Sequence, residues 1–164
     1  MRREFATQGL VAAILLAAVV GAADPPPDTM ARIRSRIEAR YPSNYSMQKT
    51  LIEDQVESYN ALYVYAPADI PEQVLGRIKA PIEARYPDNF SMQKTLVEDQ
   101  VDSLRFLRKY RPDGVPQSVL DDITKSIAKR YPDNYSMQKT LIEDQVESYR
   151  KLNSSPEGSA GQGK

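Results

Sequence analysis

The strongest constraint on this sequence is a segment that occurs three times, starting at Arg40, Arg85 and Arg130, 45 residues apart. Each copy begins Arg-Tyr-Pro, continues through Asn-(Tyr/Phe)-Ser-Met-Gln, and shares 15 of 19 positions with both others. A fixed period of this size is typical of an array of one supersecondary unit, in which each unit buries its apolar face against its neighbours. The sequence therefore predicts a repeat architecture.

The sequence of each repeat predicts a short helix, a turn and a long helix. Apolar residues recur at helical spacing over 30–41, and Pro42 ends this short helix because the residue before a proline is disfavoured in the α region. A helix of about 20 residues should begin at Asn44, since neither glycine nor proline interrupts the chain before Pro67. The other long helices are predicted from Asn89 to about Tyr110 and from Asn134 to about Leu152. Pro81 lies inside the second short helix and predicts a kink there.

The start of each long helix carries a capping residue. Ser43 is the expected N-cap of the first long helix, because a hydroxyl or carboxylate can accept a hydrogen bond from the first helical turn. Pro42 before that cap and Met47 after it have the spacing of a hydrophobic staple. The equivalent caps in the other repeats are Asp88 and Asp133.

The predicted fold class is all-α, with three 45-residue helical hairpins stacked as a short solenoid or closed into a six-helix bundle. The sequence does not decide between these two arrangements. The predicted segments are a signal peptide over 1–23, repeats over 24–69, 70–114 and 115–153, and a disordered tail over 154–164. The tail is small, polar and without periodicity.

The N-terminus predicts export. Arg2 and Arg3 precede an apolar run from Leu10 to Ala23, which is shorter than the roughly 20 residues that span a membrane. A cleaved signal peptide and a periplasmic or extracellular location are therefore expected, with no stable membrane span after cleavage. An uncleaved N-terminal anchor is the alternative, and the two arginines also fit a twin-arginine signal.

The composition excludes several kinds of chemistry. The chain has no histidine and no cysteine, which excludes a cysteine nucleophile, a nucleophile–imidazole pair and a zinc site of the usual ligands. Lysine plus arginine and aspartate plus glutamate number 22 each, so there is no long-range attraction to nucleic acid. The basic and aromatic residues over 105–111 suit a helix C-terminus without a ligand. No enzyme activity, cofactor or nucleic-acid partner is expected.

The carboxylates of the repeat do not form a catalytic or metal site in this interpretation. Glu53 and Asp54 are adjacent in a predicted helix and point about 100° apart, so they cannot share a proton. Lys49 and Glu53 are spaced as a solvated ion pair. The Asp and Asn of each turn supply too few oxygens for a calcium loop. No metal ligand is therefore predicted.

Two glutamines in each repeat are the strongest candidates for binding. Gln48 and Gln55 lie seven residues apart on the inward stripe, where a desolvated amide needs hydrogen-bond partners. They could bond the turn or a helix end of their own or the next hairpin, or they could line a groove for a partner's backbone. With the tyrosine and asparagine of each turn, the candidate binding residues are Tyr41, Asn44, Gln48, Gln55, Tyr86, Asn89, Gln93, Gln100, Tyr131, Asn134, Gln138 and Gln145.

The repeated segment resembles a short motif of many uncharacterised bacterial proteins. That motif has an aromatic residue, Pro-Asp-Asp/Asn-aromatic, then Met-Gln, Cys-Ile and a further Gln. This chain has tyrosine at the usual tryptophan (Tyr41, Tyr86 and Tyr131) and leucine at the usual cysteine (Leu51, Leu96 and Leu141). The resemblance implies a helical hairpin and a bacterial source, and it implies no function because the motif has no assigned activity.

Three hypotheses remain open from the sequence. The first is an exported, non-enzymatic repeat protein that binds an unknown protein or peptide of the cell envelope. The second is a small-ligand-binding or catalytic module, which requires the three turns to converge on one pocket. The third is a self-associating structural protein. In each arrangement Leu51, Leu96 and Leu141 are expected to be buried between their own short helix and a neighbouring hairpin.

Overall fold

The computed structural model describes residues 24–154, and within this range it contains six α-helices and no strand. The helices are α1 (Pro27–Arg40), α2 (Tyr45–Val64), α3 (Glu72–Arg85), α4 (Phe90–Lys109), α5 (Gln117–Arg130) and α6 (Tyr135–Ser154). The all-α prediction and the length of about 20 residues for each long helix are confirmed. The predicted signal peptide over 1–23 and residues 155–164 of the predicted tail lie outside the described residues.

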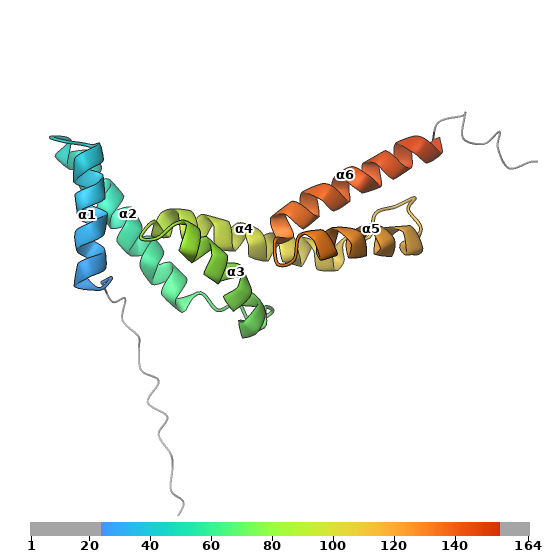
Figure 1. Ribbon diagram of the computed structural model, residues 1–164, viewed down its shortest axis with the longest axis horizontal. Coiled ribbons are helices and arrows are strands. Elements are labelled where there is room, and N and C mark those ends of the chain that lie inside the picture. Colours follow the sequence, from blue (N-terminus) through green and yellow to red (C-terminus); the bar gives the residue numbers. More distant parts are fainter. Residues whose placement is uncertain (1–23, 155–164) are drawn as a thin grey trace, which may run out of the picture.

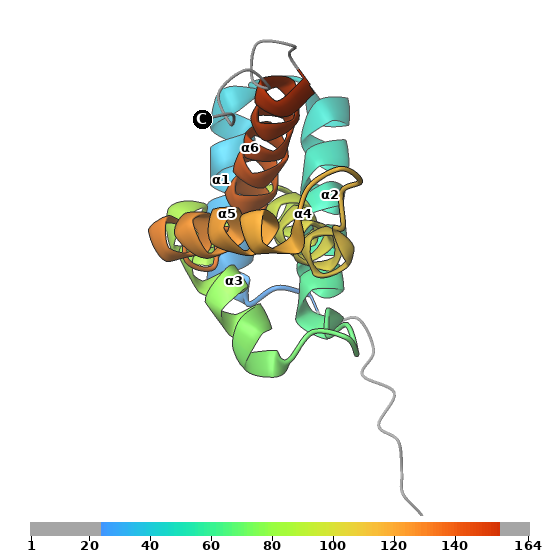
Figure 2. The same cartoon turned by 90° about the vertical axis from the view of Figure 1, so that its right-hand side faces the viewer.

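The helices pack in a simple order. Each short helix lies against the long helix that follows it, and the long helices pack α2 against α4 and α4 against α6. No other pair of helices within residues 24–154 packs together, so α2 and α6 lie apart. The three helix pairs follow one another from α1 at one end to α6 at the other (Figure 1). Their direction changes along the chain, since α1 and α2 stand upright in Figure 2 while α5 lies across the view.

Each long helix is capped by an asparagine, which corrects the predicted cap by one residue. Asn44 Oδ1 accepts a hydrogen bond from the Met47 N–H at 3.1 Å, and Asn89 and Asn134 cap α4 and α6 in the same way. Ser43, the predicted cap, has a left-handed φ of 62°, and its equivalents Asp88 and Asp133 have a φ of 57°. Short polar side chains tolerate this conformation better than most residues do. The predicted staple is wrong as well, because Ser43 and not Pro42 precedes the cap.

The buried residues of the long helices are shared between consecutive repeats. Leu62 and Tyr65 of the first repeat pack on a core that includes Val97 and Val101, which are at most 1% exposed. Leu107 and Tyr110 of the second repeat pack in the same way on Ile142 and Val146. The leucines that were predicted to be buried, Leu51, Leu96 and Leu141, are only half-buried. In the second and third repeats the fully buried position is one residue later, at Val97 and Ile142, because that side of the helix faces both its own short helix and the preceding repeat.

The second short helix contains the one proline within a described helix interior. α3 is continuous from Glu72 to Arg85 through Pro81, which is exposed. Proline removes a backbone donor at this position. The helix continues past it nonetheless, and Leu75 and Ile78 on its buried face are 7% and 1% exposed. Within the described residues, no helix is both long enough and apolar enough to cross a membrane.

Candidate functional site

The first glutamine of each repeat bonds the turn between the two helices of its own repeat. Gln48 Nε2 donates a hydrogen bond to the carbonyl oxygen of Tyr41 at 2.8 Å. Gln93 and Gln138 donate to Tyr86 and Tyr131 at 2.7 and 2.6 Å, and both of these glutamines are buried. The amide thus satisfies a carbonyl at the end of the short helix, where intrahelical donors are missing. This is the first of the two roles that the sequence allowed.

The second glutamine bonds the next repeat. Gln55 Oε1 accepts hydrogen bonds from the backbone N–H groups of Phe90 and Ser91 at 2.7 and 3.4 Å, and its Nε2 donates to Asn89 Oδ1 at 3.5 Å. Gln100 repeats the arrangement with the Ser136 N–H and Asn134 Oδ1, both at 3.2 Å. Each glutamine therefore satisfies free donors at the start of the following long helix, which its own cap does not reach.

These contacts belong to two inter-repeat joints. The first joint links the first and second repeats and comprises Arg32, Arg36, Gln55, Asp88 and Phe90. The second joint links the second and third repeats and comprises Arg77, Gln100, Asp133 and Tyr135. In both joints, the loop between the two helices of one repeat and the start of its long helix contact the preceding repeat. The contacts are made by both the short and the long helix of that preceding repeat.

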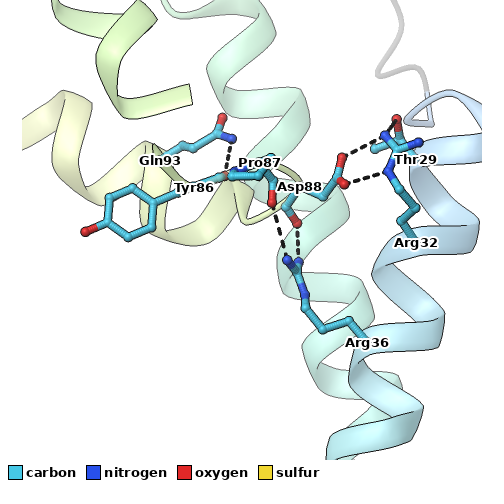
Figure 3. A network of polar contacts seen from close by, with 7 residues as sticks. All are labelled: Thr29, Arg32, Arg36, Tyr86, Pro87, Asp88 and Gln93. Atoms are coloured by element: carbon cyan, nitrogen blue, oxygen red, sulfur yellow. Dashed lines mark hydrogen bonds and ion pairs between the residues drawn. The ribbon is translucent and has the colours of Figure 1, made fainter. Parts of the chain in front are cut away.

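The first joint includes a bidentate ion pair, shown in Figure 3. Arg32 Nε and Nη2 donate to the two Asp88 carboxylate oxygens at 2.6 and 2.9 Å, and Nη2 also donates to Thr29 Oγ1 at 3.0 Å. Arg36 donates to the carbonyl oxygens of Pro87 and Asp88. The hydrogen bond from Arg32 lowers the pKa of the Asp88 carboxyl below its ordinary value. Charge-assisted pairs of this geometry fix the orientation of the two groups as well as attract them.

The second joint keeps a weaker form of the same pair. Arg77 Nε donates to Asp133 Oδ1 at 3.0 Å. The position equivalent to Arg36 is Pro81, which has no side-chain donor. The Tyr135 hydroxyl adds a 3.3 Å hydrogen bond to Asp133, and burial raises the pKa of Tyr135. The arginine–carboxylate pair is therefore common to both joints, whereas the extra backbone contacts belong to the first.

An aromatic pair and a lysine complete the first joint. The Tyr59 ring meets the Phe90 ring edge-on, with their centroids 5.0 Å apart. Lys79 Nζ donates to the carbonyl oxygens of Leu62 and Tyr65 at 3.0 and 3.3 Å, at the end of α2. Burial of the ammonium lowers the pKa of Lys79. The lysine therefore acts as a C-terminal cap for α2 that is supplied by the next repeat.

The twelve candidate residues do not gather at one place. The asparagines cap α2, α4 and α6, three of the six glutamines are buried, and all glutamines but Gln145 bond a turn or joint. Each turn tyrosine lies under the guanidinium of the arginine before it, with 5.5 to 5.6 Å between the Arg Cζ and the ring centroid. Most of the candidate set thus has a structural role.

The exception is Gln145, on what we call the trailing face of the third repeat. This face comprises Asp122, Ile123, Tyr131, Leu141 and Gln145, which line a groove of about 430 Å³. Gln145 is exposed and its side chain makes no hydrogen bond among residues 24–154. In the first repeat the equivalent groove is lined by Leu51 and Gln55 together with residues of α4, whose first turn is seated there. The trailing face is thus an interface position without an occupant among the described residues.

The first repeat lies at the opposite end of the described chain (Figure 1), and what we call its leading face comprises Ser43, Asn44, Tyr45, Ile52 and Val56. Tyr45 is 76% exposed, whereas its equivalents Phe90 and Tyr135 are half-buried in the joints. Ile52 and Val56 are half-buried beside a groove that also contains Met30 and Asn60. No acceptor among residues 24–154 bonds the backbone N–H groups of Tyr45 and Ser46.

The sequence analysis missed the ion pairs of the joints, Arg32–Asp88 and Arg77–Asp133, because it assigned the two aspartates as helix caps. A signal for them existed in the alignment of the repeats. Arginine at position 32 and 77 becomes Asp122 in the third repeat, and aspartate at 88 and 133 is Ser43 in the first. The two variations are correlated, because each side chain changes only at the position where residues 24–154 contain no neighbouring repeat to supply its partner. Among the described residues, no cluster of three or more Asp and Glu side chains could hold a metal ion.

No protein-family model matches this chain, and comparisons with curated proteins and with solved structures likewise gave no match.

Proposed function

We propose that this protein is an exported, non-enzymatic helical-repeat protein that binds another polypeptide on the trailing face of its third repeat. The observation that carries this proposal is the exposed, unbonded Gln145 at a position where Gln55 and Gln100 each bond the backbone of a following helix. A surface of this kind recognises main-chain donors, which any polypeptide helix offers at its N-terminus. The half-buried Ile123 and Leu141 beside it supply apolar area.

An open stack of three hairpins is the arrangement that we propose for the array. It is supported by the packing order, in which each repeat packs only on its neighbours in sequence. A closed bundle would bring α2 and α6 together and would leave no free faces. An open stack leaves one leading and one trailing face, as repeat arrays do at their ends.

The alternative of a small-ligand-binding or catalytic module receives less support. It requires the three turns to converge, whereas Tyr41, Tyr86 and Tyr131 each serve a separate hairpin. The asparagines are engaged as helix caps. The chain also offers no histidine or cysteine for nucleophilic or acid–base chemistry.

The export part of the proposal has a direct test. The first 23 residues have the length and polarity of a cleaved signal, so protein recovered outside the cytoplasm should begin after Ala22 or Ala23. N-terminal sequencing of that protein reads the cleavage site. A membrane-bound product that still begins at Met1 would instead support the N-terminal anchor.

The binding part is tested by site-specific photo-crosslinking in intact cells. A photoreactive residue at position 145 should give adducts with a polypeptide, because the trailing face would be covered by its partner. The matched control is position 125, which is exposed on α5 and does not line the groove. Position 55 is a second control, since its joint is already filled by α4. Equal adduct yields from 145 and 125 would contradict the proposal.

A further inference from the structure

We propose that the occupant of the trailing face is the leading face of a second copy of this chain, so that copies assemble head to tail. This inference rests on the proposed function and names the partner for the same surface. Each face is one half of a joint that the chain already builds twice. A joint between copies would repeat the internal joints without any new type of contact.

The hydrogen-bonding groups of the two faces match. Gln145 offers the amide that, at Gln55, accepts from Phe90 and Ser91 and donates to Asn89. The leading face offers the corresponding groups, namely the N–H donors of Tyr45 and Ser46 and the Oδ1 of Asn44. Within the described residues, neither those two N–H groups nor the Gln145 amide has a partner. Docking one face on the other would satisfy both sets at once.

The apolar groups match as well. Ile33 and Ile78 on the short helices are 0% and 1% exposed, whereas the equivalent Ile123 on the trailing face is half-buried. At the end of α6, Leu152 is 75% exposed, although its equivalents Leu62 and Leu107 pack on the next repeat's core. The receiving side chains for that leucine are Ile52 and Val56 on the leading face. A joint between copies would bury both sets of apolar surface.

The charges select which turn can dock. The internal joints pair Arg32 with Asp88 and Arg77 with Asp133. On the trailing face the arginine is replaced by Asp122, so an acidic turn would place two carboxylates near each other, which is unfavourable. Ser43 makes the turn of the first repeat the one neutral turn of the three. The trailing face therefore discriminates against the turns of the second and third repeats and accepts that of the first.

The arrangement of the ends permits this assembly. The first and third helix pairs lie at opposite ends of the described chain (Figure 1), so one copy cannot close its own faces on each other. A head-to-tail contact is heterologous, and unless its rotation closes a ring it continues to longer oligomers. We therefore expect a range of masses in solution and not a single symmetric dimer.

The test is the mass of the full chain in solution, as recovered from the cells that express it, measured by sedimentation over a wide concentration range. The average mass should rise with concentration and pass that of a dimer. Gln145→Ala should weaken association about tenfold, because it leaves two helix donors unpaired at the contact. Ser43→Asp should weaken it by a similar factor through repulsion from Asp122.

The decisive variant places the arginine–aspartate pair of the internal joints at the contact between two copies. Ser43→Asp together with Asp122→Arg should associate more tightly than the unchanged chain, because it recreates the Arg32–Asp88 type of pair. Position 43 accepts aspartate with no more strain than serine, since Asp88 and Asp133 adopt nearly the same left-handed φ. Circular dichroism of each variant checks that the helices are retained.

Two outcomes would overturn the head-to-tail assembly. One is a monomer at every concentration, and the other is an association that ignores the substitutions at 43, 122 and 145. If the crosslinks from position 145 then lead to a different polypeptide, the proposed function stands and only the identity of the partner is wrong. If position 145 gives no adducts either, both proposals fail.

Discussion

The helices α2 and α6 begin with the same fifteen residues, Tyr45–Tyr59 and Tyr135–Tyr149, yet these residues have different surroundings. Ile142 is 0% exposed whereas Ile52 is half-buried, and Tyr135 is half-buried whereas Tyr45 is 76% exposed. The glutamines show the reverse, since Gln55 is 8% exposed whereas Gln145 is exposed. α6 has a repeat before it and α2 has one after it. Burial in this protein is thus set by the neighbouring repeat.

The largest expected effect comes from the two equivalent isoleucines. Ile142→Ala should lower the free energy of unfolding by about 2–5 kcal/mol, because it leaves a cavity against Leu107 and Tyr110. Ile52→Ala should lower it by less than about 1.5 kcal/mol, because that side chain is already partly in water. Urea denaturation of both variants provides the comparison. Equal losses would mean that the preceding repeat contributes nothing to the burial of α6.

The two equivalent glutamines should show the opposite order of effects, with the larger loss of stability in the first repeat and the smaller in the third. Gln55→Ala should lower the free energy of unfolding by about 1–3 kcal/mol, because the N–H groups of Phe90 and Ser91 lose their acceptor. Gln145→Ala should change it by no more than about 0.5 kcal/mol in a dilute, monomeric sample. The same denaturation experiment measures both. A large loss for Gln145→Ala alone would show that its side chain has an internal partner.

A smaller effect should appear when the pH is lowered through the range in which Asp88 titrates. Arg32 lowers the pKa of Asp88 below the unfolded value of about 3.9, so the pair stabilises the fold above about pH 4. This contribution is lost as the pH falls through the folded pKa. Arg32 is more than half exposed, so solvent screening keeps the contribution of this pair below that of the buried isoleucine and glutamine.

The measurement for this pair is the free energy of unfolding between pH 6 and 2, in the unchanged chain and in Arg32→Gln. The difference between the two should shrink as the pH falls, and it should also shrink in high salt because the pair is partly exposed. Arg34, which is exposed on the same helix and makes no ion pair among residues 24–154, provides the control Arg34→Gln. A difference independent of pH would assign the effect of Arg32 to packing.

The smallest expected effect comes from the turn residue that precedes the asparagine cap, which is Ser43 in the first repeat and Asp133 in the third. Ser43→Gly should raise stability by only about a few tenths of a kcal/mol, because glycine adopts the left-handed φ of 62° without strain. Asp133→Gly relieves the same strain but loses the pair with Arg77, so its net change should be less favourable. Thermal unfolding of the two variants compares them. An equal gain at both positions would show that the second ion pair contributes nothing.

The sequence of one repeat determined the local structure. The period of 45 residues, the prolines at the ends of the helices and the lack of breakers predicted the two helices of each repeat and their lengths. These features depend on propensity and steric restriction within a few residues. The local prediction failed at the cap, where Ser43 and Asn44 are adjacent and both are good capping residues. The turn needs a left-handed residue before the cap, and only the backbone conformation shows which of the two takes that role.

The tertiary structure decided at which of the equivalent positions in the three repeats a side chain is buried and at which it is exposed. Leu51, Leu96 and Leu141 have the right chemistry for a core, but they lie one residue before the side of the helix that faces two neighbours. Gln55 and Gln145 are identical in local sequence, and only the presence of α4 on the first separates a helix cap from an open surface. Local sequence cannot encode this difference, because the free energy of burial depends on atoms supplied by another repeat.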